Sequence, residues 1–379
     1  MSIPAAETSS QPDLPGTPAL EILNRSSGAC HAVPSGATLE HLTVALVALY
    51  AGFGSLVYQR FGIGSYVHRL LQPELWTSLL YLIPLGAFYL LLYHRLAARS
   101  PDGRKVRGLR DGWRAAWQEL RNGAFSGPRL SFLAVAAVSL ALFFNAFTAW
   151  KTMIPAVHPF SQDLLLEHVD ALLHGGAPYR LVNWLPLVPI DRIYFFGWGE
   201  VLMLALVVLA WRAETRILLA LALTWIVLGT VVAMAVSSAG PPYFLALTGS
   251  HEYADLFAHL ADAKGGPLLA PQIQHNLWSI YRSGTMAAGS GISAFPSMHV
   301  AVPALLAFAT WRRSRTLSLV LAAFTAVVLL SSVALGWHYA VDGYASIIGA
   351  GAIWMLVARL PVRAAFGESG GPAPGRTAA

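Results

Sequence analysis

His338 and Asp342 have the spacing of a histidine–carboxylate pair that prepares an imidazole for catalysis. They lie four residues apart in GWHYAVD, so on a helix they would share a face with their side chains in reach. A carboxylate bonded to one ring nitrogen fixes the tautomer and leaves the other nitrogen basic and directed at a substrate. The alternative is an interfacial histidine satisfied by an acidic neighbour. Within a membrane segment, however, ionisable residues are costly and usually functional.

A second segment, GSGISAFPSMH, places Ser297 and His299 at the start of an apolar run. If a helix begins there, its free N–H groups and dipole favour an anion, although Ser297 could serve only as the helix cap. The preceding glycines supply backbone that can wrap around oxyanions. The segment lacks the Gly-Lys-Ser/Thr of a nucleotide-binding loop, so ATP is not indicated. Two histidines, one paired with an aspartate, facing an anion cradle indicate phosphoryl transfer: one histidine attacks phosphorus while the other protonates the leaving oxygen.

The elements that must position these residues are membrane helices. Of the 379 residues, 56% are hydrophobic and only 12% are charged, whereas soluble domains carry about 25% charged residues. Apolar windows of about 20 residues, the length that crosses a bilayer, predict an all-α polytopic membrane helix bundle of about eight transmembrane helices. The candidate spans are 41–58, 75–94, 130–150, 193–211, 217–237, 298–311, 317–336 and 339–358, of which the sixth is short.

The distribution of charge predicts how these spans are oriented. The net charge is +6, and basic residues gather in the predicted loop 95–129 and in two shorter loops on the same side, around Arg212 and Arg312. The positive-inside rule then predicts both termini and these loops in the cytoplasm, and the membrane that we expect is the plasma (inner) membrane. Because the basic residues fit topology and anionic lipid headgroups, no nucleic-acid partner is expected. Residues 1–38 and 361–379 are predicted to be disordered cytoplasmic tails.

With this orientation, three distant segments reach the outer face of the membrane. SSAGPPYF (237–244) ends the fifth span, AFPSMH (294–299) opens the sixth, and GWHYAVD (336–342) joins the seventh to the eighth. Their convergence predicts an active site that faces the periplasm or the cell exterior. Aromatic residues near span ends, among them Trp198 and Trp337, are interpreted as membrane-interface belt residues rather than as substrate-stacking groups.

At SAFPSMHVA and GWHYAVD, the chain resembles the second and third signature motifs of the type-2 phosphatidic acid phosphatase superfamily. The Pro-Ser-Met-His form, LWSIYRSG before the loop and SAGPPYF at the end of the fifth span look closer to the branch that contains inositol phosphorylceramide synthase. The resemblance covers roughly residues 130–358 and implies a six-helix catalytic core at 130–360. Residues 39–129 would then add two transmembrane helices and a basic cytoplasmic loop.

The resemblance also implies roles for individual residues. His338 would be the nucleophile that forms a phosphohistidine, Asp342 would orient it, and His299 would protonate the leaving group. Ser297 and nearby backbone amides, including that of Gly291, would bind phosphate oxygens. Four residues at the end of the fifth span would bind substrate, namely Gly240, Pro241, Pro242 and Tyr243. The hydrolytic and transfer enzymes of this family use no metal, so neither a metal nor another cofactor is expected.

Two departures from the family pattern remove cations that would surround the phosphate. The Ser-Arg pair that opens the third family motif falls on Ser331 and Ser332, and the first-motif segment AVSSAGPPYF has no cation. Because the transferring phosphoryl group normally has cations around it, we expect Arg282 and Lys151 to bind the phosphate. Arg282 could instead be a solvated loop cation, and Lys151, which ends the third predicted span, could snorkel to the interface. Other candidates on the outer side are Arg180, Arg192 and Lys264.

HPFSQDLLLEHVDALLHGG (158–176) predicts an amphipathic helix that starts at Ser161 and ends at Gly175. Its leucines would rest on the membrane surface, and its acidic residues would face water. The two histidines at its centre and end, His168 and His174, are six residues apart and off one face, which argues against a metal site. Acidic and amide side chains here could instead select a polar acceptor near the bilayer.

The predicted activity is that of a membrane lipid phosphotransferase. It would use a phosphohistidine to move a phosphate-containing headgroup from a membrane lipid to an alcohol, as inositol phosphorylceramide synthase does. The missing arginine favours such a transfer, because a phosphodiester carries less charge than a phosphomonoester. The alternatives are a lipid phosphate or polyprenyl pyrophosphate phosphatase, with water as the acceptor, and a non-catalytic lipid-binding or transport protein. The presence of both His338 and Asp342 argues against the last alternative.

Overall fold

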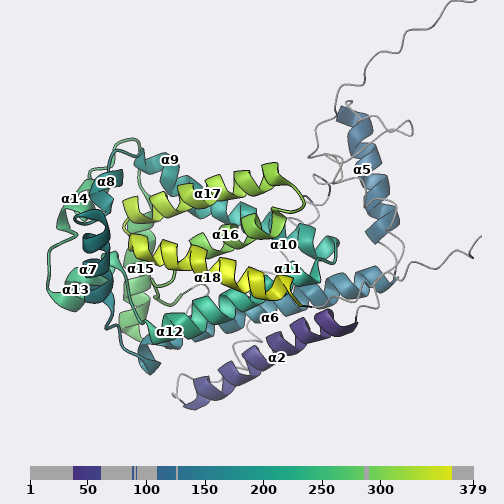
Figure 1. Ribbon diagram of the computed structural model, residues 1–379, viewed down its shortest axis with the longest axis horizontal. Helices are drawn as coiled ribbons and strands as arrows, with labels where there is room; N and C mark the ends of the chain where they lie inside the picture. The colour runs from purple at the N-terminus through teal and green to yellow at the C-terminus, as the bar shows by residue number, and fades with distance from the viewer. Residues whose placement is uncertain are drawn as a thin grey trace, which may run out of the picture.

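The computed structural model describes residues 37–60, 109–124, 127–285 and 290–360, together with Phe88 and Leu91. Every regular element in these ranges is helical (Figure 1), which confirms the predicted all-helical membrane fold. The elements are α2 (Ala37–Arg60), α5 (Leu109–Ala124), α6 (Gly127–Val157), α7 (Asp163–His174), α8 (Tyr179–Val182), α9 (Leu187–Arg192), η2 (Ile193–Gly197), α10 (Trp198–Trp211), α11 (Thr215–Ile226), η3 (Val227–Val232), α12 (Ala233–Ala235), η4 (Pro241–Tyr243), α13 (Phe244–Thr248), α14 (Ala254–Ala261), α15 (Leu269–Ser283), α16 (Met298–Thr310), α17 (Arg315–Ala334) and α18 (Ala340–Ala358).

Five described helices are long and apolar enough to cross a membrane, so the chain is a multi-pass membrane protein. They are Leu133–Val157, Leu187–Trp211, Thr215–Ala235, Arg315–Ala334 and Ala340–Ala358. Two shorter apolar helices, Leu42–Leu56 within α2 and Met298–Thr310, correspond to the first and sixth predicted spans. The predicted span 75–94 lies outside the described residues apart from Phe88 and Leu91, and the two predicted tails lie outside them almost entirely.

The short helix α16 occupies the centre of the bundle, where it packs against α17, α18, α10 and α11. Between Val300 and Ala309 nearly all of its side chains are buried. The apolar composition of α16 therefore reflects contact with neighbouring helices more than contact with lipid. Its 13 residues rise only about 20 Å, less than the ~30 Å hydrocarbon core. The end of α16 that carries His299 can therefore lie within the bundle rather than on its surface.

The N-terminal helix α2 is an integral part of the bundle, because it packs against α6 and α11. The Tyr50 hydroxyl lies 2.8 Å from the Thr230 hydroxyl in the buried interior, and the Trp150 indole N–H donates to the Tyr50 carbonyl oxygen at 3.2 Å. A side chain at Gly54 would lie within 2.8 Å of the Trp150 ring. These contacts fix α2 against the helix that carries Lys151.

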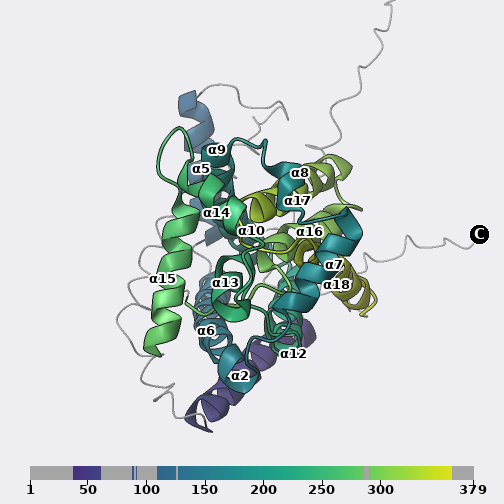
Figure 2. The ribbon, with the colours of Figure 1, turned by 90° about the vertical axis from the view of Figure 1, so that its left-hand side faces the viewer.

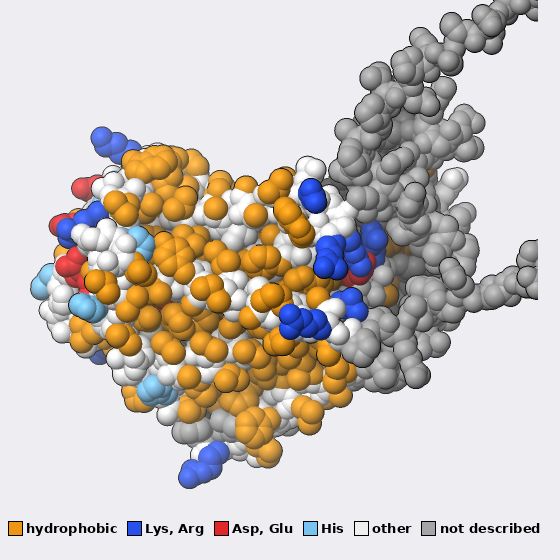
Figure 3. Space-filling model, viewed as in Figure 1, with side chains coloured by type: hydrophobic (Ala, Val, Ile, Leu, Met, Phe, Trp, Pro, Cys, Tyr) orange, Lys and Arg blue, Asp and Glu red, His pale blue; other side chains and the backbone are white. Residues whose placement is uncertain are grey.

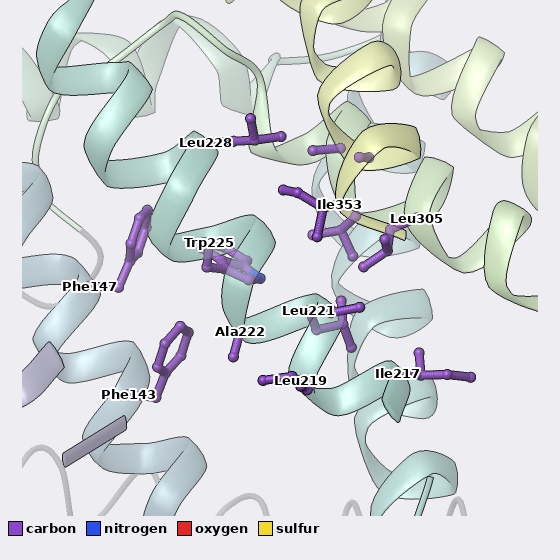
Figure 4. Close-up of a cluster of buried hydrophobic side chains, with 14 of the residues drawn as sticks. Phe143, Phe147, Ile217, Leu219, Leu221, Ala222, Trp225, Leu228, Leu305 and Ile353 are labelled. Atoms are coloured by element: carbon purple, nitrogen blue, oxygen red, sulfur yellow. The ribbon is translucent and has the colours of Figure 1, made fainter. Parts of the chain in front are cut away.

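Buried hydrophobic side chains form two large clusters. The membrane cluster, which includes Trp225 and Leu305, lies between α2, α6, α10, α11, α16 and α18, and Figure 4 shows part of it. The outer cluster includes Tyr194, Leu256 and Tyr339 and joins α7, η2, α13 and α14 to the connection between α17 and α18. The outer cluster underlies the candidate site.

The short helices α7, α8, α13, α14 and α15 gather at one end of the bundle (Figures 1 and 2), called here the outer end. Figure 3 shows acidic and histidine side chains at this end, a group of Lys and Arg side chains at the opposite end and a broad apolar surface between them. Arg212, Arg216 and Arg313 lie at the opposite end, where Arg216 bonds the Leu360 carbonyl and Arg313 pairs with Glu214. The larger group of basic side chains in this view therefore lies at the opposite end, whereas the outer end carries most of the acidic and histidine side chains together with a few Lys and Arg side chains.

Candidate active site

Three segments, 237–244, 294–299 and 336–342, carry the predicted site residues and are called here the first, second and third chemical segments. They meet at the outer end of the bundle. The Ala294 N–H donates to the Ser238 carbonyl oxygen at 2.9 Å, and the Ser297 N–H donates to the Asp342 carbonyl oxygen at 3.4 Å. Gly240 has a φ of 94°, and a Cβ there would lie 2.9 Å from the Ala294 Cβ and 3.0 Å from the Trp337 carbonyl oxygen. Only glycine fits both this backbone conformation and this space, so Gly240 allows all three segments to pack together.

His338 and Asp342 are paired, but not as neighbours on one helix. The helix α18 begins at Ala340, so His338 precedes it and Asp342 occupies its first turn. The Asp342 Oδ2 lies 3.2 Å from the His338 Nδ1 and accepts from the Tyr339 N–H at 3.1 Å, which closes a capping box. The predicted helical i,i+4 arrangement is therefore wrong, because the capping box makes the contact. Since Nδ1 is directed at the carboxylate, Nε2 is the nitrogen left for a substrate.

His299 lies opposite this pair, one residue into α16. Its ring stacks on Tyr194 at 4.6 Å between centroids and packs against Trp198 at 4.3 Å. The Ser297 N–H, two residues before His299, donates to the Asp342 carbonyl oxygen at 3.4 Å, which holds the start of α16 beside the His338–Asp342 pair. Tyr194 in turn stacks on Trp337 at 6.2 Å. The structure thus brings both histidines into a single site walled by aromatic rings.

Trp198 and Trp337 belong to this wall, so the prediction that they are membrane-interface belt residues is wrong. Both indole nitrogens are buried, whereas a belt residue would direct its N–H to the wet interface. Tyr194 was missed altogether. It is only 1% exposed, and the signal that could have found it is its four-residue spacing from Trp198, which puts both rings on one face of the helix.

Ser297 occupies the N-cap position of α16, yet its side chain does not cap the helix. Its hydroxyl is buried and has no hydrogen-bond partner among the described residues. The alternative in which Ser297 serves only as a cap is therefore not realised. A buried hydroxyl beside the start of α16 is instead available to a phosphate oxygen.

Gly291 lies directly against Lys151. Its φ is 96°, and a Cβ would lie 2.8 Å from the Thr152 backbone nitrogen and 2.9 Å from the Lys151 carbonyl carbon. The loop before α16 therefore passes over α6 at the residue that carries a cation. Lys151 does not end its helix as predicted, since α6 continues to Val157. The half-buried Lys151 instead lies within α6, against Gly291.

The other candidate cations lie elsewhere. Arg282 is exposed in the last turn of α15, Lys264 is exposed in a loop, Arg180 pairs with Glu252 at 3.3 Å, and Arg192 donates to the Pro267 carbonyl oxygen. Where the family has its Ser-Arg pair, the hydroxyls of Ser331 and Ser332 donate to the carbonyls of their own helix. Of the five predicted cations, Lys151 is the one that contacts the site.

The predicted substrate-binding residues pack against α15, next to the site. Pro241 to Tyr243 form the 3₁₀ turn η4, and Gly240, Pro241 and Tyr243 are buried. The Tyr243 hydroxyl donates to the Gln274 carbonyl oxygen at 3.0 Å, and its ring stacks on Trp278 at 4.8 Å. These contacts attach α15 to the fifth-span segment. A role for these residues, or for Pro242, in binding substrate stays a prediction.

Helix α7 supplies two buried carboxylates that sequence reasoning missed. Asp163 is 3% exposed and accepts from the Ser238 hydroxyl, the Ala239 and Gly240 N–H groups and the Tyr339 hydroxyl, at 2.7–3.1 Å. Burial and the neighbouring Asp163 charge raise the pKa of Tyr339, which keeps the phenol protonated as the donor. Asp163 thus joins the first chemical segment to the third.

The second carboxylate, Asp170, is 1% exposed and accepts from the N–H groups of Ala340 and Val341 at 2.7 and 2.9 Å. Burial raises the pKa of Asp170, and these two N–H donors act against that shift. The prediction that these acids face water is wrong, because the first turn of α18 offers N–H groups that need acceptors. Exposed leucines cover the opposite face of α7, as expected, at Leu164, Leu165, Leu172 and Leu173.

The ends of α7 agree in part with the prediction. The helix begins at Asp163, two residues after Ser161, and ends at the left-handed cap Gly175. His174 bonds the Tyr344 hydroxyl at 2.9 Å, whereas His168 is exposed. Within the part of the chain that the structure describes, no three His, Cys, Asp or Glu side chains are grouped as metal ligands.

A comparison with known proteins places these segments in a family. A family model described as the PAP2 superfamily matches residues 166–356, which make up half of the chain and include all three chemical segments. No curated protein and no solved structure matches the chain. Lys151 and Asp163 lie outside the matched range, so their placement rests on the structure alone.

Proposed function

Because the chain belongs to the PAP2 superfamily, whose members are lipid phosphatases and phosphotransferases, we propose that it transfers a phosphate-containing headgroup between a membrane lipid and an alcohol. The reaction resembles that of inositol phosphorylceramide synthase. The observation that carries the proposal is that the start of α16, with His299, lies beside the His338–Asp342 pair, and that Lys151 lies against the loop before α16.

In the first step, the His338 Nε2 attacks the phosphorus of the donor lipid. A nitrogen–phosphorus bond forms as the bond from phosphorus to the leaving lipid oxygen breaks, and protonated His299 gives its proton to that oxygen. Asp342 stabilises the positive charge that develops on the His338 ring. The products of this step are a lipid alcohol, a phosphohistidine that still carries the headgroup, and neutral His299.

In the second step, neutral His299 accepts the proton of the incoming alcohol while its oxygen attacks phosphorus. The nitrogen–phosphorus bond breaks, and both histidines return to their starting protonation states. Lys151, the Ser297 hydroxyl and the N–H groups around Gly291 are placed to neutralise the charge that spreads over the phosphate oxygens. If water replaces the alcohol, the same sequence of steps is a hydrolysis.

The sparseness of cations supports transfer over hydrolysis of a phosphomonoester. Ser331 and Ser332 replace the Ser-Arg pair of the family and turn their hydroxyls to helix carbonyls. Among the five candidate cations, only Lys151 contacts the site. A phosphodiester donor carries one negative charge and is matched by one cation, whereas a phosphomonoester carries close to two.

The second candidate function is a lipid phosphate or polyprenyl pyrophosphate phosphatase. It is favoured by Lys151 itself, since an ammonium beside His299 would assist a more highly charged substrate. Purified enzyme in mixed micelles, with donor lipid labelled at the phosphate, separates the two. Transfer requires a labelled product that appears only with an alcohol acceptor; labelled inorganic phosphate in its place would replace the transferase with the phosphatase. Binding without turnover would support a non-catalytic lipid-binding protein.

The proposed location is the plasma membrane, with the site facing outward and both termini in the cytoplasm. The larger group of basic side chains lies at the end opposite the site, which supports this orientation. The chain has one cysteine, Cys30. An impermeant maleimide added to intact cells should leave Cys30 unlabelled and should label a Lys264→Cys variant. The reverse pattern would invert the topology.

A further inference from the structure

Two carboxylates, one on α18 and one on α7, accept hydrogen bonds at the N-terminus of α18. Asp342, on α18 itself, uses Oδ2 for the Tyr339 N–H and for the ring of His338. Asp170, on α7, accepts from the next two N–H groups, with Oδ2 on Ala340 and Oδ1 on Val341. Each carboxylate therefore has its own set of donors in the same helical turn.

This division of donors matters because the first N–H groups of a helix have no partner within the helix. If Asp170 did not accept from Ala340 and Val341, these donors would compete for Asp342, whose second oxygen, Oδ1, is buried and has no hydrogen-bond partner among the described residues. Any shift of Asp342 toward them would weaken its contact with the His338 Nδ1. The geometry of the catalytic pair thus depends on a residue that touches neither histidine.

We propose that Asp170 is a positioning residue for phosphoryl transfer, which caps α18 from α7 and thereby reserves Asp342 for His338. This inference rests on the proposed function, in which His338 is the nucleophile. Asp170 acts through Asp342 and does not contact the reacting atoms. Its effect is therefore on the rate at which His338 attacks and not on lipid binding.

Asp163 makes the support from α7 rigid. It lies seven residues before Asp170 on the same buried face of α7, about 10 Å along the helix axis. It accepts from the Tyr339 hydroxyl at 3.0 Å and from the Gly240 N–H at 2.7 Å. The residue between His338 and α18 is thus held from the same helix that caps α18, so α7 and the first turn of α18 behave as one unit.

The decisive variant is Asp170→Asn in the full-length enzyme. An asparagine keeps one acceptor oxygen, but its NH₂ group would oppose the second N–H donor of α18. We expect phosphoenzyme formation, measured by rapid mixing with labelled donor lipid, to slow by roughly 10- to 100-fold. The burst amplitude, measured without an alcohol acceptor so that it counts competent enzyme, should not change, and neither should the Kd for donor lipid, taken from the concentration dependence of the rate. The matched control is Glu167→Gln, which removes a partly exposed carboxylate one turn away on α7 and should leave rate and amplitude unchanged.

Two results would overturn the proposal. One is a lower burst amplitude at an unchanged rate, which is the signature of a purely structural role, and the other is no change in either quantity.

If Asp170→Asn gives no burst, hydrogen exchange at the backbone amides decides. Faster exchange confined to Ala340 and Val341 supports the positioning role, and faster exchange throughout the spans contradicts it. If the wild-type enzyme turns over lipid without a phosphoenzyme, the proposed function fails instead. The positioning role is then decided by kcat, which Asp170→Asn must still lower at unchanged KM.

Discussion

The membrane cluster and the outer end are held together by different kinds of interaction. In the membrane cluster, apolar side chains such as Phe143, Trp225 and Leu305 pack against one another between helices. At the outer end, the buried carboxylates Asp163 and Asp170 accept hydrogen bonds from backbone and hydroxyl groups of segments far away in the chain. Apolar packing tolerates small shifts, whereas a hydrogen bond weakens steeply with angle and distance.

The difference follows from what each region contains. Helices in the membrane cluster satisfy their own backbone groups, so only their side chains need partners. The outer end is built from short helices and connections, whose free N–H groups need acceptors. We therefore expect changes in the membrane cluster to alter stability, and changes at the outer end to alter the rate of reaction.

The largest expected effect is that of His338→Ala at the outer end. Turnover of labelled donor lipid should fall by roughly 10⁴-fold or more, because no other group can form the covalent intermediate. Acid-labile, base-stable label on the protein should disappear with it. His275→Ala is the matched control, since it removes an exposed imidazole from α15. Activity near that of the wild type in His338→Ala would refute the assignment of the nucleophile.

Lys151→Met removes the cation beside His299 at nearly constant length. We expect kcat/KM to fall by roughly 100-fold, as for loss of one charge-stabilising group, with little change in thermal stability. Arg282→Met tests the other cation to which the sequence assigned phosphate binding. A larger loss in Arg282→Met than in Lys151→Met would show that the wrong cation has been placed at the phosphate.

Gly291→Ala tests the close approach of the loop to α6. Its Cβ would lie 2.8 Å from the Thr152 nitrogen, so the loop must move, and we expect kcat to fall by roughly tenfold. Gly265→Ala is matched in backbone strain, with a φ of 104°, but its Cβ would meet its nearest atom only at 3.7 Å. Equal losses in both variants would mean that strain, and not the contact with Lys151 and Thr152, is responsible.

Leu305→Ala probes the membrane cluster, where the opposite outcome is expected. The side chain is fully buried, so its truncation should lower the free energy of unfolding by about 2–5 kcal/mol. The change appears as a lower Tm in detergent, while kcat per competent enzyme, taken from the burst amplitude, stays unchanged. A lower kcat at full amplitude would show that the two regions are not separable.

The smallest expected effect is that of a chelator. The carboxylate oxygens of Asp163 and Asp170 accept hydrogen bonds from the protein itself, and the resemblance to metal-free enzymes predicts no metal at the site. Activity and Tm in excess chelator should therefore equal those without it. Loss of activity that added metal restores would contradict this expectation and would give the buried carboxylates another role.

Much of the fold follows from the sequence because its main determinant is the length of apolar runs. The five long spans and the two shorter helices correspond to predicted spans, and the three chemical segments were expected to meet. The ends of elements were harder to predict. Lys151 lies inside α6 rather than at its end, because the helix continues past the predicted apolar window through Met153 and Ile154, which are fully buried against the rest of the protein.

The contacts of the site were less predictable, since they depend on partners distant in the chain. Amphipathicity identified the two faces of α7 but not which one faces the protein, and Asp163 and Asp170 proved to be on the inner face. The spacing of His338 and Asp342 suggested a shared helix, although a capping box produces the same contact. Tyr194 could be found in the sequence only through its four-residue spacing from Trp198, because its role comes from stacking on His299.

The separation in sequence between α7 and its partners has a consequence for the synthesis of the protein. Asp163 bonds residues 75 and 176 positions later, and Asp170 bonds one 170 positions later. Both carboxylates therefore leave the ribosome long before their partners exist, and a helix outside the spans lets them remain hydrated meanwhile. Only insertion of α18, the last described helix, supplies Tyr339 and the N–H groups of Ala340 and Val341. The site is thus completed only when α18 is inserted, and a chain whose insertion has not reached α18 has no assembled His338–Asp342 pair.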